Sequence, residues 1–159
     1  MTVGDGRGRL AGESARLDAG RYPMRFAYRT LFSDMDANRH LNNGTFGRLF
    51  EEGRAHLTHR AFGAAAGGLS FLLATITIEF LSEARYPGSV EVASAVTRVG
   101  GSSYTLAQAA YQDGKCAALA DCVMVKSAAG RPVPLTGAER ELLNGLAFSG
   151  RSRPEGACP

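Results

Sequence analysis

Residues 33–54 read SDMDANRHLNNGTFGRLFEEGR, and the rest of the chain is arranged around them. Two acidic residues, Asp34 and Asp36, are followed by a histidine and two asparagines, and a helical spacing of apolar residues begins at about Asn43. We therefore predict a helix over residues 43–62, with polar groups gathered at its N-terminus. The positions that share its buried face are Phe46, Leu49, Phe50, Gly53 and Leu57.

This helix has weak intrinsic propensity because it contains Gly44, Gly47 and Gly53. Each glycine costs about 1 kcal/mol relative to alanine in a helix interior. Local preference alone does not hold such a helix together. We expect a sheet packed closely against it to do so.

The segments on either side of the helix predict strands. Residues 63–70, GAAAGGLS, close the helix and turn the chain, and the next strand has one fully apolar face of alternating residues. Short turns, including Asp113-Gly114, join the last four strands, so we expect an antiparallel meander. The predicted strands cover residues 24–32, 71–83, 90–100, 103–112 and 115–126.

The C-terminal part predicts one short helix, because Thr136 and Glu139 have the spacing of a capping box. Its apolar residues are Leu142, Leu143 and Leu146. The predicted organisation is one α+β domain, with one long helix against a curled sheet whose uncovered edges favour self-association. We expect a flexible segment over residues 1–22, the domain over 23–147 and a disordered tail over 148–159.

Composition excludes several classes of protein. The 159 residues are 45% hydrophobic and 21% charged, which is ordinary for a globular domain. The net charge is only +3 and the basic residues are scattered, so no nucleic-acid surface is indicated. Neither a membrane-spanning stretch nor a secretory signal is visible, and we expect a cytoplasmic location.

The cysteines and histidines predict neither a disulfide framework nor a metal site. Cys116 and Cys122 fall in one predicted strand, and Cys158 lies in the polar tail, so reduced thiols are expected. There is no C-x-x-C motif and no H-x-x-x-H pair among the histidines.

The polar residues ahead of the helix each admit a structural and a functional role. Asp36 can form an Asx-turn or act as a nucleophile or general base. His40 can orient substrate or water, or be structural. Asn42 and Asn43 suit helix capping by residue type, and a place in an active site is their second role. Asp34 is expected to be structural, as an acceptor of backbone hydrogen bonds.

The string of residues 34–43, D-M-D-x-x-x-H-x-N-N, followed by Phe46 and by residues 50–54, resembles the hotdog-fold acyl-CoA thioesterases of the 4-hydroxybenzoyl-CoA thioesterase type. The resemblance implies a hotdog fold, in which a curled, mainly antiparallel five-stranded sheet wraps one long central helix. It also implies an acyl-CoA substrate, a homodimer or homotetramer, and neither a metal nor a redox cofactor.

The resemblance assigns Asp36 as the working carboxylate and the backbone around Asn42 and Asn43 as the donor to the thioester carbonyl. Whether Asp36 attacks directly or activates water stays open. An apolar acyl site would be lined by Phe46, Phe50 and the strand of Ile76 and Ile78. Glu51 is a candidate for bordering the pocket of a partner subunit. Candidate ligands of the coenzyme A phosphates are Arg85, Arg98, Lys126 and Arg131.

Two other functions fit less well. Asp36, Asn38 and His40 loosely resemble the D-x-N-P-x-H string of hotdog-fold enoyl-CoA hydratases and dehydratases, but the spacing is one residue short and the proline is absent. A non-catalytic acyl-CoA-binding module would not need a carboxylate at the helix start. The acyl group is left open between aromatic, branched and medium-chain types.

Overall fold

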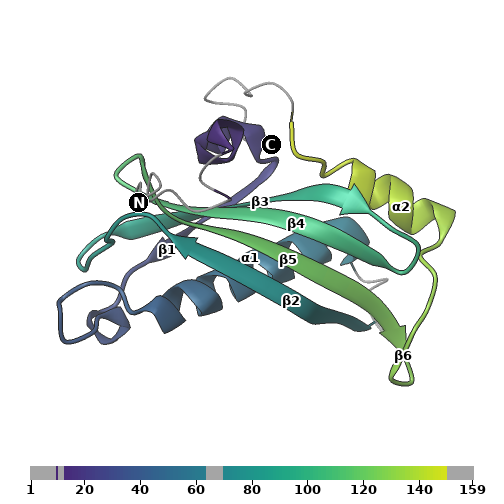
Figure 1. Ribbon diagram of the computed structural model, residues 1–159, viewed down its shortest axis with the longest axis horizontal. Helices are drawn as coiled ribbons and strands as arrows, with labels where there is room; N and C mark the ends of the chain where they lie inside the picture. Colours follow the sequence, from purple (N-terminus) through teal and green to yellow (C-terminus); the bar gives the residue numbers. More distant parts are fainter. Residues whose placement is uncertain (1–9, 11–12, 64–69, 150–159) are drawn as a thin grey trace, which may run out of the picture.

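The computed structural model describes residue 10, residues 13–63 and residues 70–149. Figure 1 shows one long helix lying along one face of a curled sheet, so the predicted α+β arrangement is confirmed. No helix in these ranges is long and apolar enough to cross a membrane. Short 3-10 helices form at Ser14–Leu17, Ala19–Arg21 and Phe32–Asp34. The other elements are β1 (Met24–Arg29), α1 (Asn43–Phe62), β2 (Ser70–Phe80), β3 (Ser89–Val99), β4 (Ser103–Gln112), β5 (Lys115–Ala128), β6 (Arg131–Pro132) and α2 (Gly137–Asn144).

The sheet has the strand order β1-β3-β4-β5-β2, with every pair antiparallel and the two-residue β6 added to β5. The predicted meander is therefore right for β3, β4 and β5 and wrong for β2, which lies at the far edge beside β5. The connection from β2 to β3, residues 81–88, is too long for a tight turn and carries the chain across the sheet. The five-strand prediction missed β6 because two residues carry no periodicity.

β2 is an exposed edge strand that ends at Phe80, three residues before its predicted end. A register shift between Leu73 and Thr75 breaks the alternation on which its single apolar face was predicted. Large apolar side chains of this edge strand are left in solvent, with Leu72 54%, Leu73 42% and Phe80 46% exposed. The prediction of one continuous alternating apolar face along this strand is therefore wrong.

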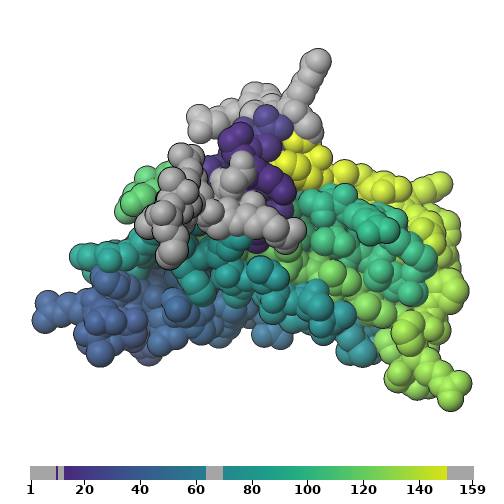
Figure 2. Space-filling view, in the orientation of Figure 1, coloured from purple at the N-terminus to yellow at the C-terminus, as the bar shows by residue number. Residues whose placement is uncertain are grey.

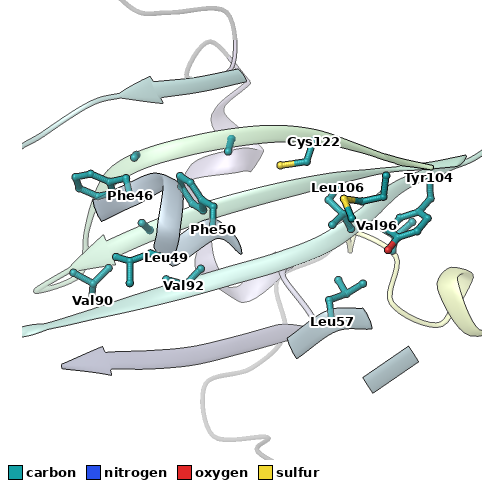
Figure 3. Packing of buried hydrophobic residues seen from close by; sticks show 14 of the residues in the cluster. Phe46, Leu49, Phe50, Leu57, Val90, Val92, Val96, Tyr104, Leu106 and Cys122 are labelled. Atoms are coloured by element: carbon teal, nitrogen blue, oxygen red, sulfur yellow. The ribbon is translucent and has the colours of Figure 1, made fainter. Parts of the chain in front are cut away.

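α1 has the predicted bounds and buries the predicted face. Figure 3 shows Phe46, Leu49, Phe50 and Leu57 directed at the sheet, among side chains that include Val90, Val92 and Leu106. At Gly53 the helix approaches the sheet so closely that a Cβ would lie 2.7 Å from Nε2 of Gln108 and 2.9 Å from Oγ of Ser94. Close packing on a sheet therefore holds this glycine-rich helix, as expected.

The other face of the sheet is covered by the N-terminal segment, which is purple in Figures 1 and 2. Nη2 of Arg16 donates to the carbonyl of Ala120 at 2.9 Å and lies 2.8 Å from a carboxylate oxygen of Asp121 on β5. Burial raises the pKa of Tyr22 to about 12, so its hydroxyl stays protonated and donates to the Arg16 carbonyl at 2.8 Å. The cluster on this face contains Leu10, Tyr22, Ala93, Ala95, Ala107, Ala109, Tyr111 and Leu119.

The prediction that residues 1–22 stand apart from the fold is therefore wrong for Leu10 and residues 13–22. Their contacts are with strands some hundred residues away, which no local pattern reveals. Residues 1–9 and 11–12 lie outside the described residues, as does most of the turn predicted over 63–70.

α2 forms with the predicted capping box between Thr136 and Glu139. Leu143 is buried and Leu142 is 48% exposed, and the prediction is wrong for Leu146, which lies beyond the end of α2 at Asn144. The prediction of a disordered tail is wrong for residues 148 and 149, because the backbone N–H of Phe148 donates to the Val96 carbonyl at 2.8 Å and that of Ser149 to the Arg21 carbonyl at 2.9 Å. Residues 150–159, including Cys158, lie outside the described residues.

Candidate active site

Asp34 is the structural centre of the loop before α1. Its buried carboxylate accepts hydrogen bonds from the backbone N–H of Leu31 at 2.8 Å and from the Tyr28 hydroxyl at 3.0 Å, and it pairs with Arg48. Its carbonyl accepts from the backbone N–H of Asn42 at 2.8 Å. These bonds fix where the helix begins, which is the structural role expected for this aspartate.

Asp36 is half-buried and uses one of its two carboxylate oxygens in the loop. Oδ1 accepts from the backbone N–H of Asn38 at 2.8 Å and of His40 at 3.4 Å, while the Asp36 N–H donates to the His40 carbonyl at 2.8 Å. The loop is closed through Arg39, which has a φ of 64°. Oδ2 makes no hydrogen bond within the described part of the chain. The Asx-turn role is thus present, and it leaves one oxygen for chemistry.

The two asparagines at the start of α1 have different hydrogen-bonding roles. Asn42 is the N-cap, and its Oδ1 accepts from the backbone N–H of Gly44 at 2.7 Å. The backbone N–H of Asn43 has no hydrogen-bond partner among residues 10, 13–63 and 70–149. Because helix N-termini carry partial positive charge, this N–H is the group best suited to stabilise an oxyanion.

A pocket of about 270 Å³ gathers these groups where the loop, α1 and the end of β2 meet. The Leu41 N–H donates to the Ala84 carbonyl at 2.7 Å, which fixes the loop to the β2–β3 connection. The rings of Phe46 and Phe80 meet edge to face, with centroids 5.6 Å apart. The pocket is lined by Asp36, His40, Leu41, Asn43, Phe46, Phe80, Leu81, Ser82, Glu83 and Ala84.

Glu83 is a pocket residue that sequence reasoning missed. Its Oε2 lies 3.0 Å from Nε2 of His40 and accepts from Nη2 of Arg85 at 2.7 Å. The hydrogen bond from Arg85 and the nearby His40 hold the pKa of Glu83 below its ordinary value. Glu83 and His40 are far apart in sequence, so only the pairing of loop and strand end brings them together.

Three predicted substrate-binding residues, Phe50, Glu51 and Arg85, do not line this pocket. Phe50 is fully buried in the core, and its carbonyl accepts from Nε2 of Gln108 at 3.0 Å. Glu51 is exposed and borders a different space, a groove of about 550 Å³ between α1 and β2. That groove is lined by Glu51, Arg54, Ala55, Thr58, His59, Phe71, Leu72, Leu73 and Met124. Ile76 and Ile78 line neither space.

The four candidate phosphate ligands are scattered. Lys126 is buried, with Nζ 2.9 Å from Glu139 and donating to the Pro134 carbonyl at 3.1 Å, so the prediction is wrong for this residue. Arg131 belongs to β6, at the opposite end of the sheet from the start of α1 in Figure 1. Arg98 is exposed near the end of β3. Arg85 stands at the active-site pocket, 3.4 Å from the His40 ring nitrogen.

The described residues contain no group of three or more His, Cys, Asp or Glu side chains that could hold a metal ion. Cys122 is buried and Cys116 is half-buried, and burial raises the pKa of Cys116 to about 11. A thiol with so high a pKa is a poor nucleophile near neutral pH.

Solved structures similar to this one support the fold. A thioesterase from Thermus thermophilus, complexed with coenzyme A and zinc, is 28% identical, with a TM-score of 0.73, over 79% of this chain and 95% of that one. A Pseudomonas aeruginosa protein is 22% identical, with a TM-score of 0.75, over 84% and 98% of the chains. The 1,4-dihydroxy-2-naphthoyl-CoA thioesterase from Synechocystis is 14% identical, with a TM-score of 0.68, over 77% and 96%.

The last two identities are too low to indicate more than a shared fold, and no curated protein matches the chain. The hotdog fold that the resemblance implied is confirmed. A family model described as thioesterase-like superfamily matches residues 30–141, which span the loop of Asp36, α1 and the whole sheet beyond it. This chain therefore belongs to the thioesterase-like superfamily.

Proposed function

We propose that this protein is an acyl-CoA thioesterase, which hydrolyses an acyl-CoA thioester to the free acid and coenzyme A. One observation carries the proposal: Asp36 and Asn43, the residues with the carboxylate oxygen and the backbone N–H that make no hydrogen bond in the described part of the chain, line the same pocket. A carboxylate and an oxyanion donor are what this hydrolysis needs. The superfamily membership and the coenzyme A bound to the Thermus thermophilus relative support it.

Thioester hydrolysis needs little acid catalysis from the protein, because a thiol with a pKa of ~8.5 leaves readily as a thiolate. Either Oδ2 of Asp36 attacks the carbonyl carbon to give a mixed anhydride, which water then hydrolyses, or it takes a proton from the attacking water. In both routes the carbonyl oxygen becomes negative. A donor such as the Asn43 N–H contributes ~3 kcal/mol to transition-state stability in comparable sites.

The remaining pocket residues are assigned by position. Phe46 and Phe80 provide an apolar wall for the acyl chain next to the thioester. His40, held by Glu83, orients the substrate or the water. Arg85, whose Nη2 lies 3.4 Å from Nε2 of the pocket residue His40, is the cation that attracts the phosphates of coenzyme A.

We also propose that two copies associate through β2. A two-fold axis near the middle of this strand would lay the Leu72 end of one copy beside the Phe80 end of the other. The groove that Glu51 borders would then face the Asp36 pocket of the second copy. Glu51 would thereby reach a partner's active site, the role for which it was a candidate from sequence.

The test is thiol release from a panel of acyl-CoAs by the wild type and by Asp36→Asn. The amide keeps the shape and the Asx-turn but removes the charge, so kcat should fall at least ~100-fold. Acyl-CoA affinity and the melting temperature should largely persist. If Asp36 serves only the turn, turnover will be unchanged, and the proposed mechanism fails. Wild-type protein that binds acyl-CoA without releasing thiol would instead be a binding module.

A further inference from the structure

The groove between α1 and β2 contains a buried cation that the proposed reaction does not use. Arg54 projects from α1 and is only 7% exposed. The walls beside it are apolar, formed by Phe71, Leu72 and Met124. The groove therefore has apolar side chains on its strand side, and the Arg54 guanidinium lies on its helix side together with Glu51, Thr58 and His59.

Arg54 has no acidic partner among the described residues. Its Nη1 donates to Oε1 of Gln108 at 3.4 Å and to Sγ of Cys122 at 3.6 Å, and both acceptors are neutral. Glu51, one turn earlier on the same helix, makes no ion pair with it. Every fully enclosed nitrogen of Arg54 makes a hydrogen bond. The N–H groups that make none are therefore accessible, and they open into the groove.

A buried guanidinium without a counter-charge is costly, because several kcal/mol of hydration are lost on burial and no ion pair offsets them. Its planar fork of donors matches a carboxylate, which can accept two parallel hydrogen bonds. Thr58, which also lines the groove, adds a hydroxyl that lies 3.4 Å from the hydroxyl of Tyr104. Glu51 stands exposed at the rim, where water screens its repulsion of an incoming anion.

The groove can reach the active site only across two subunits. Leu73 at the groove and Phe80 at the Asp36 pocket are separated by about 23 Å of strand in one chain, at ~3.3 Å per residue. The antiparallel pairing of two β2 strands proposed above would bring one copy's groove to the other's pocket. An acyl chain attached at Asp36 would then extend along apolar side chains towards Arg54 of the second subunit.

We propose that this groove binds a carboxylate at the far end of the acyl chain, with Arg54 as its charged ligand. The proposal rests on the proposed function and deepens it, because it names carboxyacyl-CoA thioesters as the substrate class. The carboxylate supplies the counter-charge that the described residues lack. The apolar walls accommodate the methylene chain.

The experiment compares adipoyl-CoA with hexanoyl-CoA, and glutaryl-CoA with pentanoyl-CoA, which differ within each pair in the terminal carboxylate. The wild type should prefer the carboxylated member of at least one pair. Arg54→Met should lower kcat/KM for that member by about 10-fold or more, because a charge-assisted hydrogen bond is lost. The uncharged member should change by less than about 2-fold. Arg60→Gln, which removes an exposed cation from the same helix, should change neither.

Two outcomes would overturn the proposal. If Arg54 is only structural, Arg54→Met will lower the melting temperature and reduce activity on both members of a pair equally. If the counter-charge is an acid of the second subunit, Arg54→Met will shift the protein towards monomer in light scattering without changing substrate preference.

A failure of the proposed thioesterase function can be distinguished from both of these outcomes. If the wild type releases no thiol from any acyl-CoA, the groove is tested by isothermal titration with free adipate. The wild type should bind adipate and Arg54→Met should not. Equal binding by the two proteins, or binding by neither, would remove the carboxylate site.

Discussion

At the scale of the residue, Gly53 shows how one missing side chain positions the active site. The helix carries Asn43 at its start, so its distance from the sheet sets where the unpaired N–H lies. At Gly53 the backbone is close to Gln108, Ser94 and Val92, the last at 3.1 Å from the Cβ position. The buried amide of Gln108 donates to both Ser94 and the carbonyl of Phe50, so it has little freedom to move away.

We predict that Gly53→Ala destabilises the protein. The added methyl would overlap these atoms, and overpacking of this kind costs ~1–3 kcal/mol, which outweighs the ~1 kcal/mol gained in helix propensity. Gly47→Ala is the matched control, because a Cβ there meets nothing within 4 Å and should stabilise the helix. Urea unfolding of the two variants measures the difference. Equal stability would show that the helix can move off the sheet freely.

At the scale of the element, α2 is tied to the end of β5 by a buried ion pair. Nζ of Lys126 lies 2.9 Å from the Glu139 carboxylate, which also accepts from the Thr136 N–H at 2.7 Å. Burial alone would raise the pKa of Glu139. The hydrogen bonds from Lys126 and Thr136 outweigh it and hold that pKa below its ordinary value of 4.5.

This pKa predicts a pH dependence of stability. A carboxyl group with a lower pKa in the folded state stabilises the fold when it is ionised, so its contribution is present above pH 4.5 and is lost as the pH falls through the folded value. Glu139→Gln should therefore be less stable near pH 7 and lose less stability on acidification. Glu141→Gln, an exposed carboxylate on α2, is the control. Melting curves of both variants at pH 7 and below pH 4.5 measure this difference. Equal losses of stability on acidification in the two variants would exclude the Lys126–Glu139 pair as the cause.

At the scale of the whole molecule, other elements pack on both faces of the sheet, and its edge strands β1 and β2 each pair with one strand only among the described residues. α1 covers one face, and residues 13–22 with Phe148 pack on part of the other. The edge strand β2 pairs only with β5, and Leu72, Leu73 and Phe80 lie exposed along it. A free edge with apolar side chains favours pairing with another strand.

We predict that the protein is at least a dimer and that Leu72→Lys converts it to a monomer. A lysine on this edge places a charge against the apolar Phe80 end of the second copy's β2 and opposes strand pairing. The monomer should stay folded and lose activity, because the site would lack its second subunit. Leu142→Lys, an exposed leucine on α2 away from β2, should leave the dimer intact. Light scattering measures both, and a monomeric wild type at micromolar concentration would contradict the edge pairing.

The sequence by itself determined the parts that depend on local patterns. The spacing of apolar residues gave the bounds of α1, and residue type gave the caps at Asn42 and Thr136. The alternation of apolar residues and the turn residues between them predicted the strands β3 to β5. The pocket that unites Asp36 with Asn43 was also predictable, because a short loop must place them close together.

The tertiary structure alone decided which residues from distant segments meet. Glu83 lies beside His40, Lys126 forms an ion pair with Glu139, and Arg54 lines a groove beside the edge strand β2. None of these three contacts was predicted from the sequence. The same holds for β2 at the sheet edge and for residues 13–22 on the sheet. The physical reason is that local periodicity shows whether a face is apolar, whereas its partner is chosen by burial summed over contacts far apart in the chain.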